Sequence, residues 1–121
     1  LAQVCQPRRA LLVASTDLSH FYTQAEARDL DMHMLSQVQA FSPRGVLQAE
    51  ATGTGFACGA GAVAAVLWAA QALGADSARI IHYSTSADET GDTSQVVGYG
   101  AVVLTKIAAP QPPQQPPGQP A

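Results

Sequence analysis

A window of 25 residues without a charged side chain, residues 51–75, narrows the possible folds of this sequence. A window of this length could cross a membrane, or it could lie in the core of a globular domain. Ala and Gly dominate it instead of large apolar residues, and acidic Glu50 and Asp76 flank it where a membrane span favours basic residues. We therefore expect a buried helix over residues 58–73, ended by Gly74, that packs against a sheet.

The rest of the folded region alternates between strand and helix patterns. The apolar run at residues 10–15 predicts a strand that is buried on both faces. A capping-box sequence, T-Q-A-E, at residues 23–26 predicts the start of a helix, and residues 42–45, which include a proline, predict its end. Residues 78–84 and 96–104 predict two further strands. This order favours an α/β fold in which helices pack on a mixed β-sheet.

Charge and cysteine content exclude several classes of partner. The chain carries 6 Lys+Arg and 9 Asp+Glu, which gives a net charge of -3 at pH 7. Binding to nucleic acid or to anionic lipid needs clustered basic residues, so we predict neither a nucleic-acid partner nor a membrane. Cys5 and Cys58 are too few for a disulfide framework, and no secretory leader is recognisable. We therefore expect a cytoplasmic protein.

The two ends of the sequence differ from its centre. Residues 109–121 are rich in Pro and Gln and hold six of the eight prolines, which predicts a disordered tail after a folded unit over residues 1–108. The sequence starts at Leu1 instead of Met, so we expect a fragment of a longer protein.

The first candidate site directly follows the predicted strand at residues 10–15. Its sequence, S-T-D-L-S-H, places Asp17 and His20 where ligands bind in open α/β sheets, beyond the carboxyl ends of the strands. A carboxylate can fix the tautomer of a histidine and raise its basicity, for a metal or for proton transfer. These residues are therefore candidate catalytic groups. Alternatively, Asp17 caps the next turn and His20 makes a buried polar contact.

The second candidate is Cys58, in the Gly-rich sequence G-T-G-F-A-C-G-A-G. A cysteine in the first turn of a helix lies at the positive end of the helix dipole, which favours the thiolate that a nucleophile or a metal ligand requires. The glycine spacing matches neither phosphate-binding fingerprint, so a nucleotide site is not expected. Alternatively, Cys58 is a small buried residue beside glycines that let helix and sheet approach closely.

The third candidate follows the predicted strand at residues 78–84. Ser86 and Asp88 lie at the carboxyl end of this strand, where they could line a cofactor pocket. Ser and Asp are also ordinary turn formers, so both interpretations remain open.

Four segments in this order resemble the C-terminal part of the Memo family, which is known in bacteria and archaea as AmmeMemoRadiSam system protein B. They read A-S-T-D-L-S-H-F, A-C-G-A-G, H-Y-S-T-S-A-D-E-T-G-D and V-V-G-Y-G-A. The resemblance covers about residues 10 to 105. It implies an α/β fold shared with the class III extradiol dioxygenases, together with metal binding and redox chemistry.

The resemblance also implies a site, a cofactor and partners. Cys58 matches the ligand cysteine of the family, and Asp17 and His20 match polar residues of the same pocket, with His20 a possible second ligand. Iron or copper is the implied metal, and AMMECR-type and radical SAM proteins are the implied partners. Two further histidine ligands belong to the N-terminal half of the family and have no counterpart here. The resemblance therefore implies an incomplete site.

Three classes of function follow from these observations. The first is a metal-binding, redox-associated protein with a dioxygenase-like pocket. The second is a metal-free hydrolase-type enzyme in which Cys58 attacks, His20 acts as base and Asp17 orients it. The third is a non-enzymatic adaptor whose crevice binds a partner, because a fold alone does not determine a function.

Overall fold

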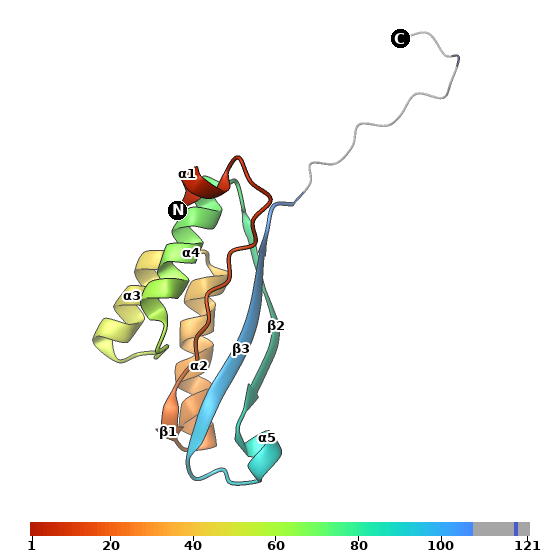
Figure 1. Ribbon diagram of the computed structural model, residues 1–121. Coiled ribbons are helices and arrows are strands. Elements are labelled where there is room, and N and C mark those ends of the chain that lie inside the picture. The colour runs from red at the N-terminus through yellow and green to blue at the C-terminus, as the bar shows by residue number, and fades with distance from the viewer. Residues whose placement is uncertain (108–117, 119–121) are drawn as a thin grey trace.

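The computed structural model describes residues 1–107 and Gly118 and shows three main helices beside a small antiparallel sheet (Figure 1). The strand order is β1-β3-β2, and both pairings are antiparallel. The predicted mixed sheet is therefore wrong for the described residues, although the α/β class is confirmed. The elements are α1 (Ala2–Cys5), β1 (His20–Tyr22), α2 (Gln24–Gln39), α3 (Pro43–Thr52), α4 (Ala60–Ala72), β2 (Ser77–Thr85), α5 (Ala87–Thr90) and β3 (Val96–Thr105).

Helix α2 begins at the predicted capping box. The Thr23 side chain accepts a hydrogen bond from the Glu26 backbone N–H, and the Glu26 side chain accepts one from the Thr23 N–H. These bonds satisfy donors that a helix start otherwise leaves unpaired. The buried face of α2 contributes Met34 and Leu35 to the core and packs against β3 and β2.

Helix α3 was not predicted from the sequence. Residues 42–45, which were predicted to end the preceding helix, instead begin α3 after α2 has ended at Gln39: the Ser42 Oγ accepts a hydrogen bond from the Gly45 N–H at 3.0 Å, and Pro43 occupies the first turn. Proline is well tolerated at this position, since the N–H that it lacks has no partner within a helix. Val46 and Ala49 are buried, and Gly53 ends α3 in the left-handed conformation, at φ +72°.

Helix α4 differs from its prediction in position and packing. It starts at Ala60 after the N-cap residue Gly59, so Cys58 precedes the helix and is not in its first turn. Leu67 reaches the common core, but the most extensive contacts of α4 are with α3 rather than with a strand. Trp68 is 47% exposed. The prediction that α4 is buried against the sheet is therefore wrong for the described residues.

The predicted buried strand at residues 10–15 is also wrong. This segment runs extended beside α4 and β3 but is assigned to no strand (Figure 1). Leu11 is 89% exposed and Val13 is 74% exposed. A strand needs a hydrogen-bonded neighbour, and within residues 1–107 the chain first reaches β3 at Leu18 and Ser19.

The strands predicted at residues 78–84 and 96–104 are confirmed as β2 and β3. The short helix α5 forms between them. None of the helices within residues 1–107 has the length and apolar character needed to cross a bilayer. The predicted tail, apart from Gly118, lies outside the described residues.

Candidate functional site

Three predicted site residues from two distant segments meet at one end of the fold. Asp17 lies on the segment that leads into β1, His20 is the first residue of β1, and Cys58 lies in the loop between α3 and α4. One ligand atom from each residue, a carboxylate oxygen, an imidazole nitrogen and the Cys58 Sγ, lies within 4.8 Å of the other two. The sequence patterns indicated these residues separately, and the structure brings them together.

Backbone hydrogen bonds fix Cys58 beside Asp17. The Asp17 N–H donates to the Cys58 Sγ at 3.3 Å, and the Cys58 N–H donates to the Asp17 carbonyl at 3.2 Å. This reciprocal pair of hydrogen bonds fixes the position of the Cys58 sulfur beside Asp17.

Thr16 and Gly59 make a second connection between the two segments. The Thr16 Oγ1 accepts a hydrogen bond from the Gly59 N–H at 2.8 Å and lies 3.6 Å from the Cys58 Sγ. A Cβ at position 59 would lie 2.7 Å from the Ser15 carbonyl oxygen, which is closer than real Cβ contacts allow. Glycine is therefore required for this close approach. The role of Thr16 was missed, because nothing in its sequence pattern distinguishes it from its neighbours.

A hollow of about 310 Å³ opens beside the group. His20 and Cys58 line it together with Tyr22, Phe56 and Glu50. The Tyr22 and Phe56 rings stack with centroids 5.9 Å apart, and the Glu50 carboxylate accepts a hydrogen bond from the Ala57 N–H at 2.8 Å. These contacts support the loop that carries Cys58. The hollow gives a small ligand access to the sulfur and the imidazole.

His20 lies next to an unusual backbone conformation. Phe21 has a φ of +68°, in the left-handed region that bulky residues rarely adopt, and the β1–β3 register is irregular between His20 and Tyr22. The His20 Nε2 is 3.8 Å from the Asp17 Oδ2, which is too long for a hydrogen bond. Asp17 therefore does not fix the histidine tautomer in this structure, and both side chains remain available to a ligand.

A buried carboxylate supports the segment between Asp17 and His20. Asp31, on α2, has no exposed surface, and its Oδ1 accepts a hydrogen bond from the Ser19 N–H at 2.8 Å. Its Oδ2 accepts one from the Tyr83 hydroxyl at 2.6 Å. The pKa of Tyr83 is raised well above its usual value. The larger cause is burial, and the next is the hydrogen bond to Asp31.

The neighbouring strand leaves space for this carboxylate at Gly98. A Cβ at position 98 would overlap the Asp31 Oδ2, so the close packing of α2 on β3 depends on glycine here. Asp31 was missed as a site-supporting residue. A signal did exist, since Asp31 shares the apolar face of α2 with Ala27, Met34 and Leu35.

The structure does not bring Ser86 and Asp88 into this group. They lie at the end of β2 and in α5, and β3 separates β2 from β1. The Ser86 Oγ accepts a hydrogen bond from the Val97 N–H at 3.1 Å, and Asp88 is exposed. Their assignment as cofactor-binding residues stays a prediction.

Comparison with known proteins identifies the family. The profile of the Memo-like protein family matches residues 1–103. A MEMO1 family protein of Methanosarcina acetivorans is 34% identical over 97 residues, which are 80% of this chain and 36% of the relative. One of Methanopyrus kandleri is 33% identical over 99 residues, 82% of this chain and 35% of the relative.

A third relative, a MEMO1 family protein of Methanothermobacter thermautotrophicus, is 37% identical over 92 residues, 76% of this chain and 33% of the relative. The chain thus spans about a third of the length of the curated relatives it matches. No solved structure matches the chain significantly. Because the family profile matches most of its residues, the chain belongs to the Memo-like protein family.

Proposed function

We propose that this chain carries part of a metal site in a redox-associated protein with a dioxygenase-like pocket. The convergence of Asp17, His20 and Cys58, with ligand atoms within 4.8 Å of one another, carries the proposal. Three side chains of ligating type around one point can share one ion, whereas the same residues further apart could not.

The chemistry of the three donors fits a transition metal. A thiolate suits copper and iron, and an imidazole suits both metals as well. A bound ion of this kind supplies electron transfer or Lewis-acid chemistry. Cys58 would hold the ion through its Sγ and His20 through its imidazole, while the Asp17 carboxylate would offset the positive charge. The Asp17 N–H, which donates to the Cys58 Sγ, would orient the sulfur and lower its electron density.

The hollow beside the group supports a reactive function rather than a closed structural site. His20 and Cys58 both face it, and both are exposed. Structural metal sites fill all their positions with protein ligands, whereas reactive sites leave one open. We propose that the rest of the full-length protein supplies further ligands, because this chain spans only about a third of its relatives.

Cobalt(II) binding to the purified chain tests this proposal. Cobalt(II) reports a thiolate ligand by an intense near-ultraviolet charge-transfer band. We expect this band in the unaltered chain and its loss in Cys58→Ala, with an affinity on the order of tenfold lower or worse. His20→Ala should weaken binding while retaining the band. The controls are Cys5→Ala, at the other cysteine, and His82→Ala, at another exposed histidine.

The outcomes separate the metal site from adventitious binding. Equal loss of binding in Cys5→Ala and Cys58→Ala would show that binding is not specific to the group of Asp17, His20 and Cys58. An unchanged band in Cys58→Ala would overturn the proposal.

The same geometry also favours a metal-free alternative, in which Cys58 is a nucleophile and His20 its base. The exposed sulfur lies within 4.8 Å of an imidazole nitrogen, so a small movement would bring them into hydrogen-bond reach. Alkylation of Cys58 in chelator-treated protein should then be rapid and should slow by on the order of tenfold in His20→Ala. Equal alkylation rates in the two proteins would exclude this alternative.

A further inference from the structure

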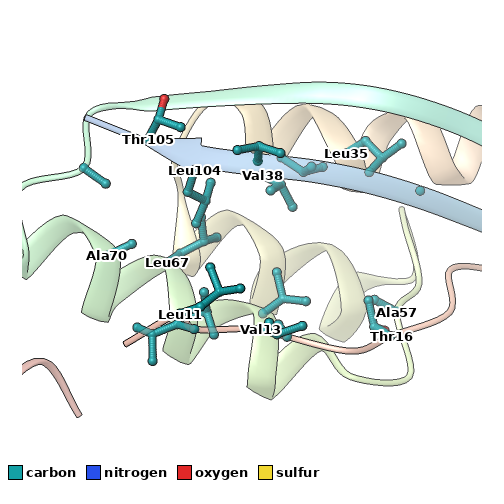
Figure 2. A pocket seen from close by; sticks show the side chains of 18 of the residues that line it. Leu11, Val13, Thr16, Leu35, Val38, Ala57, Leu67, Ala70, Leu104 and Thr105 are labelled. Atoms are coloured by element: carbon teal, nitrogen blue, oxygen red, sulfur yellow. The ribbon is translucent and has the colours of Figure 1, made fainter. Parts of the chain in front are cut away.

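An apolar groove of about 520 Å³ lies between the extended N-terminal segment, residues 10–14, and strand β3. Figure 2 shows Leu11 and Val13 on the segment and Leu104 on β3, with Leu67 of α4 also lining the groove. Because Leu11 and Val13 are 89% and 74% exposed, the groove leaves large apolar side chains in contact with water. Such a surface usually marks an interaction site.

The backbone on the β3 side of the groove forms a free strand edge. Gly98 makes both of its backbone hydrogen bonds on this side, accepting from the Leu18 N–H and donating to the Ser19 carbonyl. Backbone groups in an antiparallel strand point to alternate sides, so those of Gly100, Val102 and Leu104 face the groove as well. Within residues 1–107, β1 pairs with β3 only at Val96 and Val97, which leaves these groups without a strand partner.

The opposite side of the groove is equally unpaired. The segment at residues 10–15 is extended, and within the described part of the chain its backbone forms no strand pairing. In Figure 1 the segment runs beside β3, and Leu35 of α2 and Leu67 of α4 line the groove as an apolar floor. Two unpaired extended edges above an apolar floor are the environment that a β-strand requires.

We propose that this groove takes a β-strand from the part of the Memo-like protein that lies outside this chain. Each relative is about three times as long as its matching region, so most of a full-length protein remains to be placed. A strand here would pair with β3 and with residues 10–15 and would cover the exposed side chains of Leu11 and Val13. It would also place a strand against the α4 residues that line the groove, among them Leu67. This proposal does not depend on metal binding.

Paired proline substitutions test the free edge in the chain itself. Val102→Pro removes an N–H that faces the groove, whereas Val103→Pro removes one that faces β2, opposite Arg79. Both substitutions impose the same restriction on φ. The difference in stability between the two variants therefore reports the loss of the hydrogen bond that β3 makes to β2. We expect Val103→Pro to lower the denaturation midpoint far more than Val102→Pro. Equal losses in the dilute monomeric chain would show that the edge is already paired.

A chimaera tests the occupant. In it, this chain replaces its matching region in the Methanopyrus kandleri relative, and amide hydrogen exchange is compared with that of the chain by itself. We expect exchange at Gly100, Val102 and Leu104 to slow by on the order of tenfold or more, and Val102→Pro to become as damaging as Val103→Pro. The amides at the aligned positions of the intact relative give a second measurement that does not depend on folding of the chimaera.

Two results would overturn the proposal. Fast exchange at these amides in both the chimaera and the relative would show that no strand enters the groove. Concentration-dependent protection in the chain by itself, together with a dimer in sedimentation, would show that a second copy occupies it. The Cys58→Ala variant of the chimaera should keep the protection, which separates this proposal from that of the metal site.

Discussion

Asp31 packs against the short segment that leads into β1 and Asp17 belongs to that segment, but the surroundings of the two carboxylates are opposite. Asp31 has no exposed surface, and both of its oxygens accept hydrogen bonds from the protein. The Asp17 side chain is 50% exposed, and its Oδ2 lies 3.8 Å from the His20 Nε2. A carboxylate whose oxygens are already bonded stabilises a fold, whereas one whose oxygens remain accessible can bind a ligand. Asp31 therefore positions the segment, and Asp17 lies in the candidate site.

Replacement of the two aspartates tests this difference most strongly. Asp31→Ala leaves the Ser19 N–H and the Tyr83 hydroxyl unpaired, so the free energy of unfolding should fall by about 3 to 5 kcal/mol. Asp17→Ala should change it by less than about 0.5 kcal/mol, since its side chain is half exposed. Urea denaturation followed by circular dichroism measures both. Similar losses would contradict the distinction between them.

Gly98→Ala disturbs the same buried cluster from strand β3. The added methyl group would overlap the Asp31 carboxylate, and we expect a loss of about 2 kcal/mol in the free energy of unfolding. The loss should shrink when Asp31→Ser shortens the opposing side chain. A double-mutant cycle measures this coupling. Additive effects would show that the strain at position 98 arises elsewhere.

The half-buried phenol of Tyr83 gives the cluster a pH dependence. The folded protein raises the pKa of Tyr83 above its ordinary value of 10.0, so it holds the phenol proton more tightly than the unfolded chain does. This contribution is complete below pH 10, and stability should fall as the pH rises above it.

Tyr83→Phe measures the size of that contribution. The substitution should cost about 1 kcal/mol at neutral pH and should flatten the alkaline decline in the free energy of unfolding. Denaturation at several pH values, with Tyr99→Phe as the exposed control, tests it. An unchanged decline in Tyr83→Phe would assign the alkaline sensitivity to another group.

The smallest expected change in the free energy of unfolding is an increase. The Ser19 Oγ is fully buried and has no hydrogen-bond partner among the residues that the structure describes. Ser19→Ala removes this unsatisfied group and should raise the free energy of unfolding by up to about 1 kcal/mol. A thermal melt compares the two proteins. Destabilisation would indicate that the hydroxyl has a bound partner, such as a buried water.

The sequence predicts local structure well where the signal is local. The capping box at Thr23 and Glu26 needs only its own residues, and the consecutive strands β2 and β3 pair with each other, so all three form. The strand prediction for residues 10–15 was wrong because a strand depends on a hydrogen-bonded neighbouring strand. Within residues 1–107, no strand pairs with the segment that carries Leu11 and Val13. Helix α3 was missed because Ser42 and Pro43, which were interpreted as the end of the preceding helix, begin the next one.

The candidate site shows the same division. Asp17, His20 and Cys58 could be named from their chemistry and from the family resemblance, but their distances depend on tertiary packing. The hydrogen bonds of Cys58 with Asp17, and the contact of Thr16 with Gly59, join residues far apart in the sequence. No periodicity or motif encodes such pairings.

X-ray absorption at the metal edge of the copper-loaded chain tests the central claim most directly, because it identifies the atoms bound to the ion. We predict one sulfur scatterer and at least one imidazole in the first shell, with the sulfur lost in Cys58→Ala and retained in Cys5→Ala. An unaltered chain whose bound copper has only nitrogen and oxygen neighbours would contradict the assignment of Asp17, His20 and Cys58 as a metal site.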